Sequence, residues 1–223
     1  MRTFFAGDIQ GCADEFDDLL SEIRFDPSTD LLFLCGDAFA RGPEPVRVLE
    51  TIRSTGARMV MGNHDDKMLR WMRRQDGEIS IEVEVGKSQR TAVELMASVR
   101  AELKQFLSSL PLFIETDDWI LVHAAIHPVE ELGGTTHEIA TTYRTFPGPN
   151  VPGAPKWYTL YHGPKTVIFG HDAPGGLVRW PPQGRPLAVG LDTGCVYGGR
   201  LTAYHFESDT FHSVPARKIY HPV

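Results

Sequence analysis

Short apolar runs alternate with longer amphipathic stretches along the first part of the chain. Between the first runs, apolar residues recur at three- and four-residue spacing over Ala13–Arg24 and Pro45–Ser54, which predicts two helices. This β–α–β–α–β order is typical of an α/β fold with a mostly parallel first sheet. The runs that predict strands are Thr3–Ala6, Leu31–Cys35, Met59–Met61, Trp119–Val122 and Thr166–Phe169.

Further along, the same spacing predicts a helix over residues 64–75 and a long amphipathic helix over Thr91–Leu110. Asp76–Arg90 alternates apolar and polar positions, so we expect a small hairpin arm or a mobile flap there. Pro128–Pro155 is rich in Gly, Pro and Thr without periodicity, which in a segment this long is often functional or mobile. Three runs in the tail predict an antiparallel meander. They are Leu187–Leu191, Leu201–Phe206 and Phe211–Val214.

The size and composition are those of an ordinary soluble globular domain. The chain has 223 residues, of which 42% are hydrophobic and 23% charged, and no repeat or shift in composition marks a boundary. We therefore expect a single domain over residues 1–223. No apolar stretch approaches the roughly 18 residues of a membrane span, and the first motif leaves no room for a signal peptide. These features predict a cytoplasmic protein with no membrane partner.

The net charge and the spacing of the cysteines bear on the binding partners and on disulfide formation. A formal net charge of −7 argues against a broad basic face, so we expect no stable nucleic-acid binding. Carboxylates that hold divalent cations are compatible with this sign. Cys12, Cys35 and Cys195 show no CxxC spacing, and we expect them to be buried small residues without disulfides, as in a reducing cytosol.

Metal-competent side chains follow the predicted strands, most of them beside a glycine. If the strand ends meet at the carboxyl edge of a sheet, these side chains form one polar site. Oxygen and imidazole donors without thiolate suit manganese, iron or zinc. Two such ions, about 3.5–4 Å apart, activate water for the hydrolysis of phosphate esters and anhydrides. The motifs are Gly7-Asp8-Ile9-Gln10-Gly11, Gly36-Asp37, Gly62-Asn63-His64-Asp65, His123 and Gly170-His171.

Two further residues suit this reaction. Arg41 lies four positions after Asp37, and a guanidinium group matches phosphate oxygens in pairs. His64 adjoins Asn63 and can protonate a leaving oxygen. Each residue alone has a more ordinary interpretation, since aspartates after strands cap helices, histidines hydrogen-bond in cores and arginines lie on surfaces. Their joint placement at strand ends favours a site.

Together these motifs resemble the phosphoprotein-phosphatase (PPP) branch of the calcineurin-like metallophosphoesterases, in order and over essentially the whole chain. The resemblance implies a four-layer α/β/β/α sandwich with two mixed sheets, in the α/β class. It implies two divalent metal ions, commonly Mn²⁺ in bacterial members, with Fe, Zn, Co and Ni as alternatives. Arg41 and Asn63 would contact the phosphate, and His64 would be the general acid. One ion would be held by Asp8, Gln10 and Asp37, and the other by Asp37, Asn63, His123 and His171.

Within that branch, the likeness is nearer to symmetrical diadenosine tetraphosphate hydrolases and small bacterial relatives. The segments that carry it are Ala40-Arg41-Gly42-Pro43 and Leu191–Gly199. We therefore expect a metal-dependent phosphohydrolase whose substrate is a phosphorylated small molecule, a dinucleoside polyphosphate. The alternative is a serine/threonine or tyrosine phosphoprotein phosphatase, which would act on a phosphoprotein. A third interpretation is a catalytically impaired regulator that binds metal or phosphate.

Two positions depart from the family pattern. Ala40 stands where protein phosphatases usually carry the aspartate that supports the acid histidine, which leaves Asp65 as the candidate partner of His64. Gln10 stands where histidine is usual. An amide oxygen can bind a metal but is a poorer donor than imidazole, so we expect a weaker first ion.

The specificity elements are expected in Asp76–Arg90 and Pro128–Pro155. Trp157, Tyr158 and Tyr197 are candidates to stack on a base, although aromatic residues more commonly belong to a core.

Overall fold

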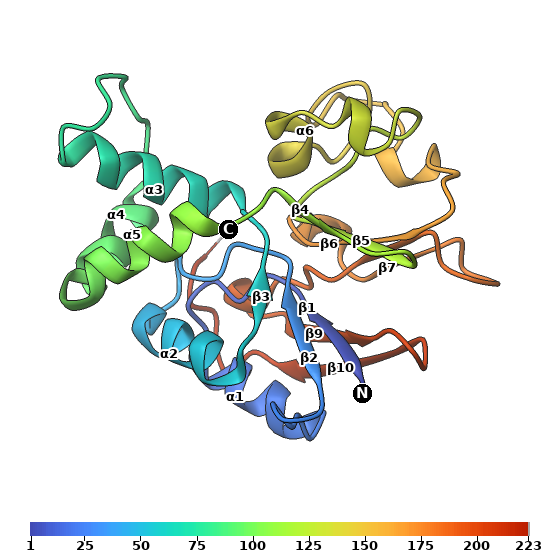
Figure 1. The fold of residues 1–223 in the computed structure, drawn as a ribbon, viewed down its shortest axis with the longest axis horizontal. Helices are drawn as coiled ribbons and strands as arrows, with labels where there is room; N and C mark the ends of the chain where they lie inside the picture. Colours follow the sequence, from blue (N-terminus) through green and yellow to red (C-terminus); the bar gives the residue numbers. More distant parts are fainter. Residues whose placement is uncertain (223) are drawn as a thin grey trace.

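The computed structural model describes residues 1–222, whose strands form two five-stranded sheets (Figure 1). The strands of the first sheet are β1 (Thr3–Ala6), β2 (Leu31–Leu34), β3 (Arg58–Met59), β9 (Arg200–His205) and β10 (Thr210–Pro215). Those of the second sheet are β4 (Phe113–Glu115), β5 (Trp119–Val122), β6 (Thr166–Phe169), β7 (Val178–Trp180) and β8 (Ala188–Gly190). The strand orders are β10-β9-β1-β2-β3 and β4-β5-β6-β8-β7.

Both sheets are mixed, and each has a parallel centre. Strands β1, β2 and β3 are parallel, whereas β9 and β10 are antiparallel to their neighbours. In the second sheet β5, β6 and β8 are parallel, and β4 and β7 form antiparallel edges. The helices are α1 (Ala13–Glu22), α2 (Pro45–Thr55), α3 (Asn63–Gln75), α4 (Lys87–Leu95), α5 (Arg100–Ser109) and α6 (His137–Thr142).

Residues along the central strands alternate between two buried cores. In β1, Phe4 and Ala6 pack toward the helices, whereas Phe5 packs toward the other sheet. In β5, Ile120 and Val122 pack toward the outer layer of the second sheet. Since successive side chains of a strand point to opposite faces, each sheet is buried on both sides. The order of layers is helices, sheet, sheet and an outer layer, which confirms the predicted sandwich.

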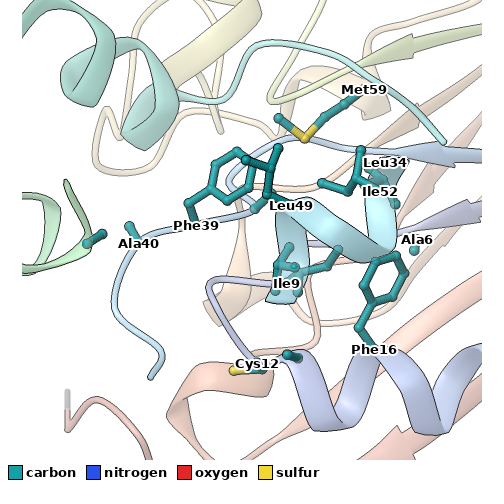
Figure 2. Packing of buried hydrophobic residues seen from close by; sticks show 14 of the residues in the cluster. Ala6, Ile9, Cys12, Phe16, Leu34, Phe39, Ala40, Leu49, Ile52 and Met59 are labelled. Carbon is teal, nitrogen blue, oxygen red and sulfur yellow. The ribbon is translucent and has the colours of Figure 1, made fainter. Parts of the chain in front are cut away.

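The core on the helix side explains why the first two helices form where they do. Phe16 of α1 and Leu49 and Ile52 of α2 point toward Ala6 and Leu34 of the first sheet (Figure 2). The helical spacing of these apolar residues places them on one face of each helix. Burying that face against the sheet stabilises both helices.

The outer layer of the second sheet is largely irregular, and α6 is its only α-helix in the part of the chain described. Trp157 and Tyr161 are buried there, and the Trp157 ring lies 5.2 Å from that of Phe169 in β6. Tyr158 stacks on the same phenylalanine at 5.7 Å. Trp157 is therefore a core residue and Tyr158 packs against the same core, which agrees with the more common of the two interpretations.

The predicted long helix and hairpin arm are wrong in detail. Asp76–Arg90 contains no strand and ends in the first turn of α4, which begins at Lys87. A 3₁₀ turn over Ala97–Val99 separates α4 from α5. The two shorter helices both pack against α3 (Figure 1).

The predicted meander is also only partly correct. β9 and β10 pair antiparallel in the first sheet, but β8 joins the second sheet parallel to β6. The chain therefore crosses from one sheet to the other over residues 191–199. Alternation of apolar residues predicts the strands but carries no information about which sheet each one joins.

Two expectations from composition can be compared with the structure. Cys12, Cys35 and Cys195 are buried free thiols, as predicted. Over residues 1–222, every helix is too short or too polar to cross a membrane.

The aromatic residues between the sheets generate a stability prediction. The Trp119 ring lies 4.9 Å from Phe5 and 4.8 Å from Phe33, so it joins the two sheets. Trp119→Ala should lower the free energy of unfolding by about 3–5 kcal/mol, measured by urea denaturation. Ile81→Ala, at a position that is 56% exposed, is the control and should change it by less than about 0.5 kcal/mol. A loss below about 1 kcal/mol for Trp119→Ala would contradict a shared core.

Candidate metal centre and active site

Five of the predicted side chains converge where the carboxyl ends of the two sheets meet. Asp8, Asp37 and Asn63 follow strands of the first sheet, whereas His123 and His171 follow strands of the second. The site therefore lies between two sheets, which corrects the expectation of a single sheet edge. It opens into a cavity of about 1110 Å³.

Backbone carbonyl groups fix the protonation of the two imidazole rings. His123 Nδ1 lies 2.7 Å from the carbonyl oxygen of Cys35, and His171 Nε2 lies 3.1 Å from that of Thr142. A carbonyl oxygen only accepts, so each of these nitrogens donates its proton. The other nitrogens, His123 Nε2 and His171 Nδ1, are left with free lone pairs. Such outer contacts are those that orient histidine ligands in metal sites.

The free nitrogens face other electron-pair donors. His123 Nε2 and His171 Nδ1 each lie 3.0 Å from Asn63 Oδ1. Asp37 Oδ2 lies 3.6 Å from His123 Nε2. Four atoms with lone pairs thus face one another. Neither imidazole nitrogen carries a proton that it could share with the amide oxygen. A cation at their centre would turn this mutual repulsion into coordination.

The carboxylates of the site crowd one another in the protein interior. Burial raises the pKa of Asp8 well above its usual range, and Asp192 and Asp37 raise it further. Burial also raises the pKa of Asp192 to about 6. The burial of Asp37 acts in the same direction, but its neighbours, among them the backbone N–H of His64, outweigh it and lower the Asp37 pKa. A divalent cation would offset this concentration of negative charge.

The donor set therefore fits divalent metal ions. Asp8, Asp37 and His123 offer ligand atoms that all lie within 4.8 Å of one another. Carboxylate and amide oxygens combined with imidazole nitrogens suit ions such as Mn²⁺, Fe²⁺ and Zn²⁺.

Two glycines allow the carboxylates to approach the loops that hold them. A Cβ atom at Gly62 would lie 2.1 Å from Asp37 Oδ1, and one at Gly170 would lie 2.1 Å from Asp8 Oδ1. Only glycine leaves room for these oxygens. The glycines beside Asn63 and His171 therefore have a steric cause.

Four site residues have a left-handed backbone that non-glycine residues rarely adopt. The φ angles are 52° at Gln10, 51° at Asp37, 72° at Arg41 and 66° at His171. Such conformations persist where the surrounding structure enforces them, and they concentrate at functional sites. The loops thus hold these side chains in place at a cost in local backbone energy.

The amide of Gln10 is compatible with two orientations. In one, Nε2 donates to Asp37 Oδ2 at 3.3 Å. In the other, Nε2 donates to the Ala40 carbonyl oxygen at 3.1 Å and Oε1 accepts from Arg41 Nη1 at 3.0 Å. The second orientation turns Gln10 Oε1 toward Asp37 Oδ2, so two oxygens with lone pairs face each other there. This orientation suits a metal ligand, whereas the first replaces the metal by a hydrogen bond.

Arg41 and Tyr197 form a pair on the wall of the cavity. The guanidinium carbon of Arg41 lies 5.4 Å from the centre of the Tyr197 ring, which is within the range of a cation–π contact. Arg41 Nε is buried and has no hydrogen-bond acceptor among residues 1–222. Tyr197 thus supports a guanidinium group that can accept a further anionic partner.

His64 contacts a residue that the sequence did not predict. Its Nδ1 lies 2.5 Å from Gln89 Nε2, and its Nε2 lies 3.8 Å from Asp37 Oδ2. Burial lowers the pKa of His64 to about 4. Asp65, the expected partner, instead accepts from the backbone N–H groups of Asp37 at 2.7 Å and Gly62 at 3.2 Å. The prediction of an Asp65–His64 pair is wrong, because the carboxylate holds the metal loops together.

Asp192 is a site residue that the sequence motifs did not predict. It is buried, it lines the cavity, and its Oδ1 accepts from the Gly194 N–H at 3.1 Å. The signal was present in the sequence, since Asp192 follows β8 as Asp8 follows β1.

The two segments expected to set specificity lie at the site in different ways. Pro128–Pro155 lines the cavity, with Arg144 among its side chains. Asp76–Arg90 does not line the cavity, but it supplies Gln89 to the ring of His64. Lys67, one helical turn after His64, also lines the cavity.

The site lies between two mixed sheets. It combines lone pairs that face one another, crowded carboxylates and an arginine with a free hydrogen-bond donor. These features define a metallophosphoesterase. The enzyme is a hydrolase that depends on divalent metal ions. The chain belongs to the calcineurin-like phosphoesterase family, whose sequence profile matches residues 1–181.

Individual relatives cover nearly the whole chain. The symmetrical bis(5'-nucleosyl)-tetraphosphatase of Edwardsiella ictaluri (strain 93-146) is 30% identical over 278 residues, covering 98% of this chain and 97% of the relative. The enzyme of the same name from Yersinia enterocolitica is 30% identical over 279 residues, covering 98% of this chain and 93% of the relative. A solved structure of a candidate diadenosine tetraphosphatase is 32% identical, with a TM-score of 0.82 and coverage of 96% and 93%. The fold is shared with a metallophosphoesterase from Sphaerobacter thermophilus, which is 18% identical, with a TM-score of 0.62 and coverage of 97% and 89%.

The raised pKa of Asp192 predicts how the stability of the metal-free protein depends on pH. Its folded-state pKa of about 6 exceeds the ordinary value of 3.8, so ionisation costs stability as the pH rises between these values. Asp192→Asn keeps an acceptor for Gly194 and removes that cost. In EDTA at pH 7.5 the variant should be more stable by about 2 kcal/mol in urea denaturation.

At pH 3.5, where the carboxyl group is mostly protonated in both states, the stabilities of the variant and the wild type should differ by less than about 0.5 kcal/mol. Asp117→Asn, at an exposed position, is the control and should have little effect at either pH. An equal gain for Asp192→Asn at both pH values would show that the carboxylate charge is not the cause.

Proposed function

We propose that the protein hydrolyses dinucleoside polyphosphates, with diadenosine tetraphosphate as the representative substrate. The observation that carries the proposal is the meeting of the unprotonated nitrogens of His123 and His171 with Asn63 Oδ1 and Asp37 Oδ2. The names of the relatives, which the chain matches almost from end to end, support this substrate class.

The residues of the site divide into two sets of ligands. Bound divalent cations would lower the pKa of a coordinated water and offset charge on the phosphoryl oxygens. We propose Mn²⁺ for both sites, with Fe, Zn, Co and Ni as alternatives. One ion would be held by Asp37, Asn63, His123 and His171, and the other by Asp8, Gln10 and Asp37.

The remaining side chains bind and orient the substrate. Arg41 would bind two phosphoryl oxygens through its fork of donors while the Tyr197 ring holds the guanidinium group in place. Asn63 would contact the phosphoryl group from the metal side. His64 Nε2 faces the cavity near Asp37 and would donate to the leaving oxygen.

The cavity suits a long anionic ligand. Its volume of about 1110 Å³ is slightly above the range of about 300–1,000 Å³ for small-molecule sites. Beyond the metal ligands, three cationic side chains line it, whereas Glu138 and Asp192 are the acidic ones. The cationic side chains are those of Arg41, Lys67 and Arg144. A polyphosphate chain carries several negative charges, which these side chains can offset.

The same features support a single domain over residues 1–223. The two sheets share a core that contains Phe5 and Trp119, and the ligands come from both sheets. A cytoplasmic location and the lack of nucleic-acid partners stay predictions from composition.

The proposal is tested by assaying purified protein with Mn²⁺ on diadenosine tetraphosphate and on a phosphopeptide. Symmetrical cleavage gives two molecules of ADP, which chromatography separates from ATP and AMP. Asp37→Asn should lower kcat/KM on the order of 10³-fold, because it removes the carboxylate shared by both ions. Asp117→Asn is the matched control.

Other outcomes would decide against this substrate class. Turnover of the phosphopeptide alone would identify a phosphoprotein phosphatase. If none of the five metals supports turnover of either substrate although the protein binds them, it is a regulator.

Gln10 generates a prediction about metal affinity. Gln10→His replaces an amide oxygen by a better donor, so the weaker of two Mn²⁺ ions should bind about 10-fold more tightly in a calorimetric titration. Gln105→His, at an exposed position, is the control. Identical titration curves for Gln10→His and the wild type would show that position 10 is not a ligand.

A further inference from the structure

Gln89 is a buried polar residue on an otherwise apolar helix face. It is 4% exposed, and Ala92, Val93 and Met96 at helical spacing from it are also buried. These three residues belong to the core on the helix side of the first sheet, so they anchor α4. A buried amide without partners is costly, and the position of Gln89 therefore demands specific hydrogen bonds.

The amide of Gln89 lies with its nitrogen toward His64 and its oxygen toward Ser88. The Ser88 hydroxyl donates to Oε1 at 3.4 Å, and Nε2 lies 2.5 Å from His64 Nδ1. Gly86 leaves room for this arrangement, since a Cβ atom there would lie 2.8 Å from Gln89 Oε1. The amide nitrogen therefore donates to the imidazole.

That hydrogen bond determines which nitrogen of His64 carries the proton. Because Nδ1 accepts from the amide, the ring proton lies on Nε2. Nε2 is on the cavity side, 3.8 Å from Asp37 Oδ2. Ala40 has no polar side chain to reach the ring, and Asp65 is occupied by backbone N–H groups. Within residues 1–222, Gln89 is the side chain that hydrogen-bonds the inner nitrogen.

We propose that Gln89 is a positioning residue that holds the Nε2–H of His64 toward the leaving oxygen and so determines which leaving groups depart readily. In the reaction, water forms the new bond to phosphorus and releases a proton to solvent. The bond from phosphorus to the leaving oxygen breaks, and its electron pair stays on that oxygen. The Nε2–H group hydrogen-bonds to that oxygen as its charge grows. The kinetic consequence rests on the proposed phosphohydrolase function, whereas the hydrogen bond itself does not.

The benefit of this hydrogen bond depends on the leaving group. A basic leaving oxygen, such as that of phenyl phosphate, gains more from a donor than the less basic oxygen of p-nitrophenyl phosphate. Loss of the contact between Gln89 and His64 should therefore slow the hydrolysis of phenyl phosphate more than that of p-nitrophenyl phosphate. A defect in folding would instead lower the turnover of both esters equally.

The first test reads the imidazole directly, without turnover. Long-range ¹H–¹⁵N spectra of metal-free, ¹⁵N-histidine-labelled protein should show His64 with its proton on Nε2. Gln89→Leu should give a mixture of tautomers, and Gln89→Glu should move the proton to Nδ1, because a carboxylate only accepts. A wild-type spectrum with the proton on Nδ1 would overturn the proposal, whatever the activity of the enzyme.

The second test is kinetic and uses the Mn²⁺-loaded enzyme. Gln89→Leu should lower kcat for phenyl phosphate by about 10- to 100-fold and that for p-nitrophenyl phosphate by less than about 3-fold, with KM little changed. Gln105→Leu, at an exposed position of α5, is the matched control. Equal losses on both esters would contradict the positioning role.

A double-mutant cycle separates positioning from a structural role. In a His64→Ala background, Gln89→Leu should change kcat by less than about 2-fold, because there is no ring left to orient. The same loss in both backgrounds would show that Gln89 only supports the fold. If the wild type hydrolyses neither ester, the proposed function fails, and the spectra still decide the hydrogen bond.

Discussion

Buried electron-pair donors that face one another are the constraint on which the rest of this structure depends. Asp37 is at the centre of this arrangement. Its Oδ1 accepts from the His64 backbone N–H at 2.9 Å, its own N–H donates to Asp65, and its Oδ2 faces Gln10 and His123. Each contact limits where the carboxylate can go, so it remains among other donors despite their repulsion. Only a cation resolves such an arrangement favourably, and the chemistry of the enzyme follows from that need.

The scaffold keeps these donors together by two means. Locally, Gly62 and Gly170 leave space for carboxylate oxygens, and strained left-handed residues such as His171 aim the loops. Globally, the aromatic residues around Trp119 hold the sheets face to face, so that imidazoles from one sheet meet carboxylates from the other. The stability of the inter-sheet core and the geometry of the metal centre are therefore linked.

Neutral amides occupy two positions where a more basic or charged group would be conventional. Gln10 stands beside Asp37 in place of an imidazole, and Gln89 contacts the ring of His64 in place of a carboxylate. An amide both donates and accepts, so it can adapt to its neighbours, but it adds no charge. The positive charge of the site is instead carried by Arg41, Lys67 and Arg144 on the cavity wall. This distribution suits an extended anionic substrate.

The sequence by itself determined the local elements and the types of donor. Apolar runs and helical spacing predicted β1, β5 and β6 with their observed bounds, because these patterns reflect burial within one element. The sequence also predicted the aspartate, asparagine and histidine at the strand ends and the glycine beside Asp37. Each of these is a short-range feature.

Only the tertiary structure decided how distant parts meet. It placed β8 in the second sheet and turned the Asp65 carboxylate to backbone N–H groups. It also brought Gln89 to His64 from a segment expected to be a hairpin arm or a mobile flap. These outcomes depend on contacts between residues far apart in the chain, and the local alternation of polar and apolar positions does not encode them. A buried polar residue in a helix needs a hydrogen-bond partner, but tertiary packing determines which partner it contacts.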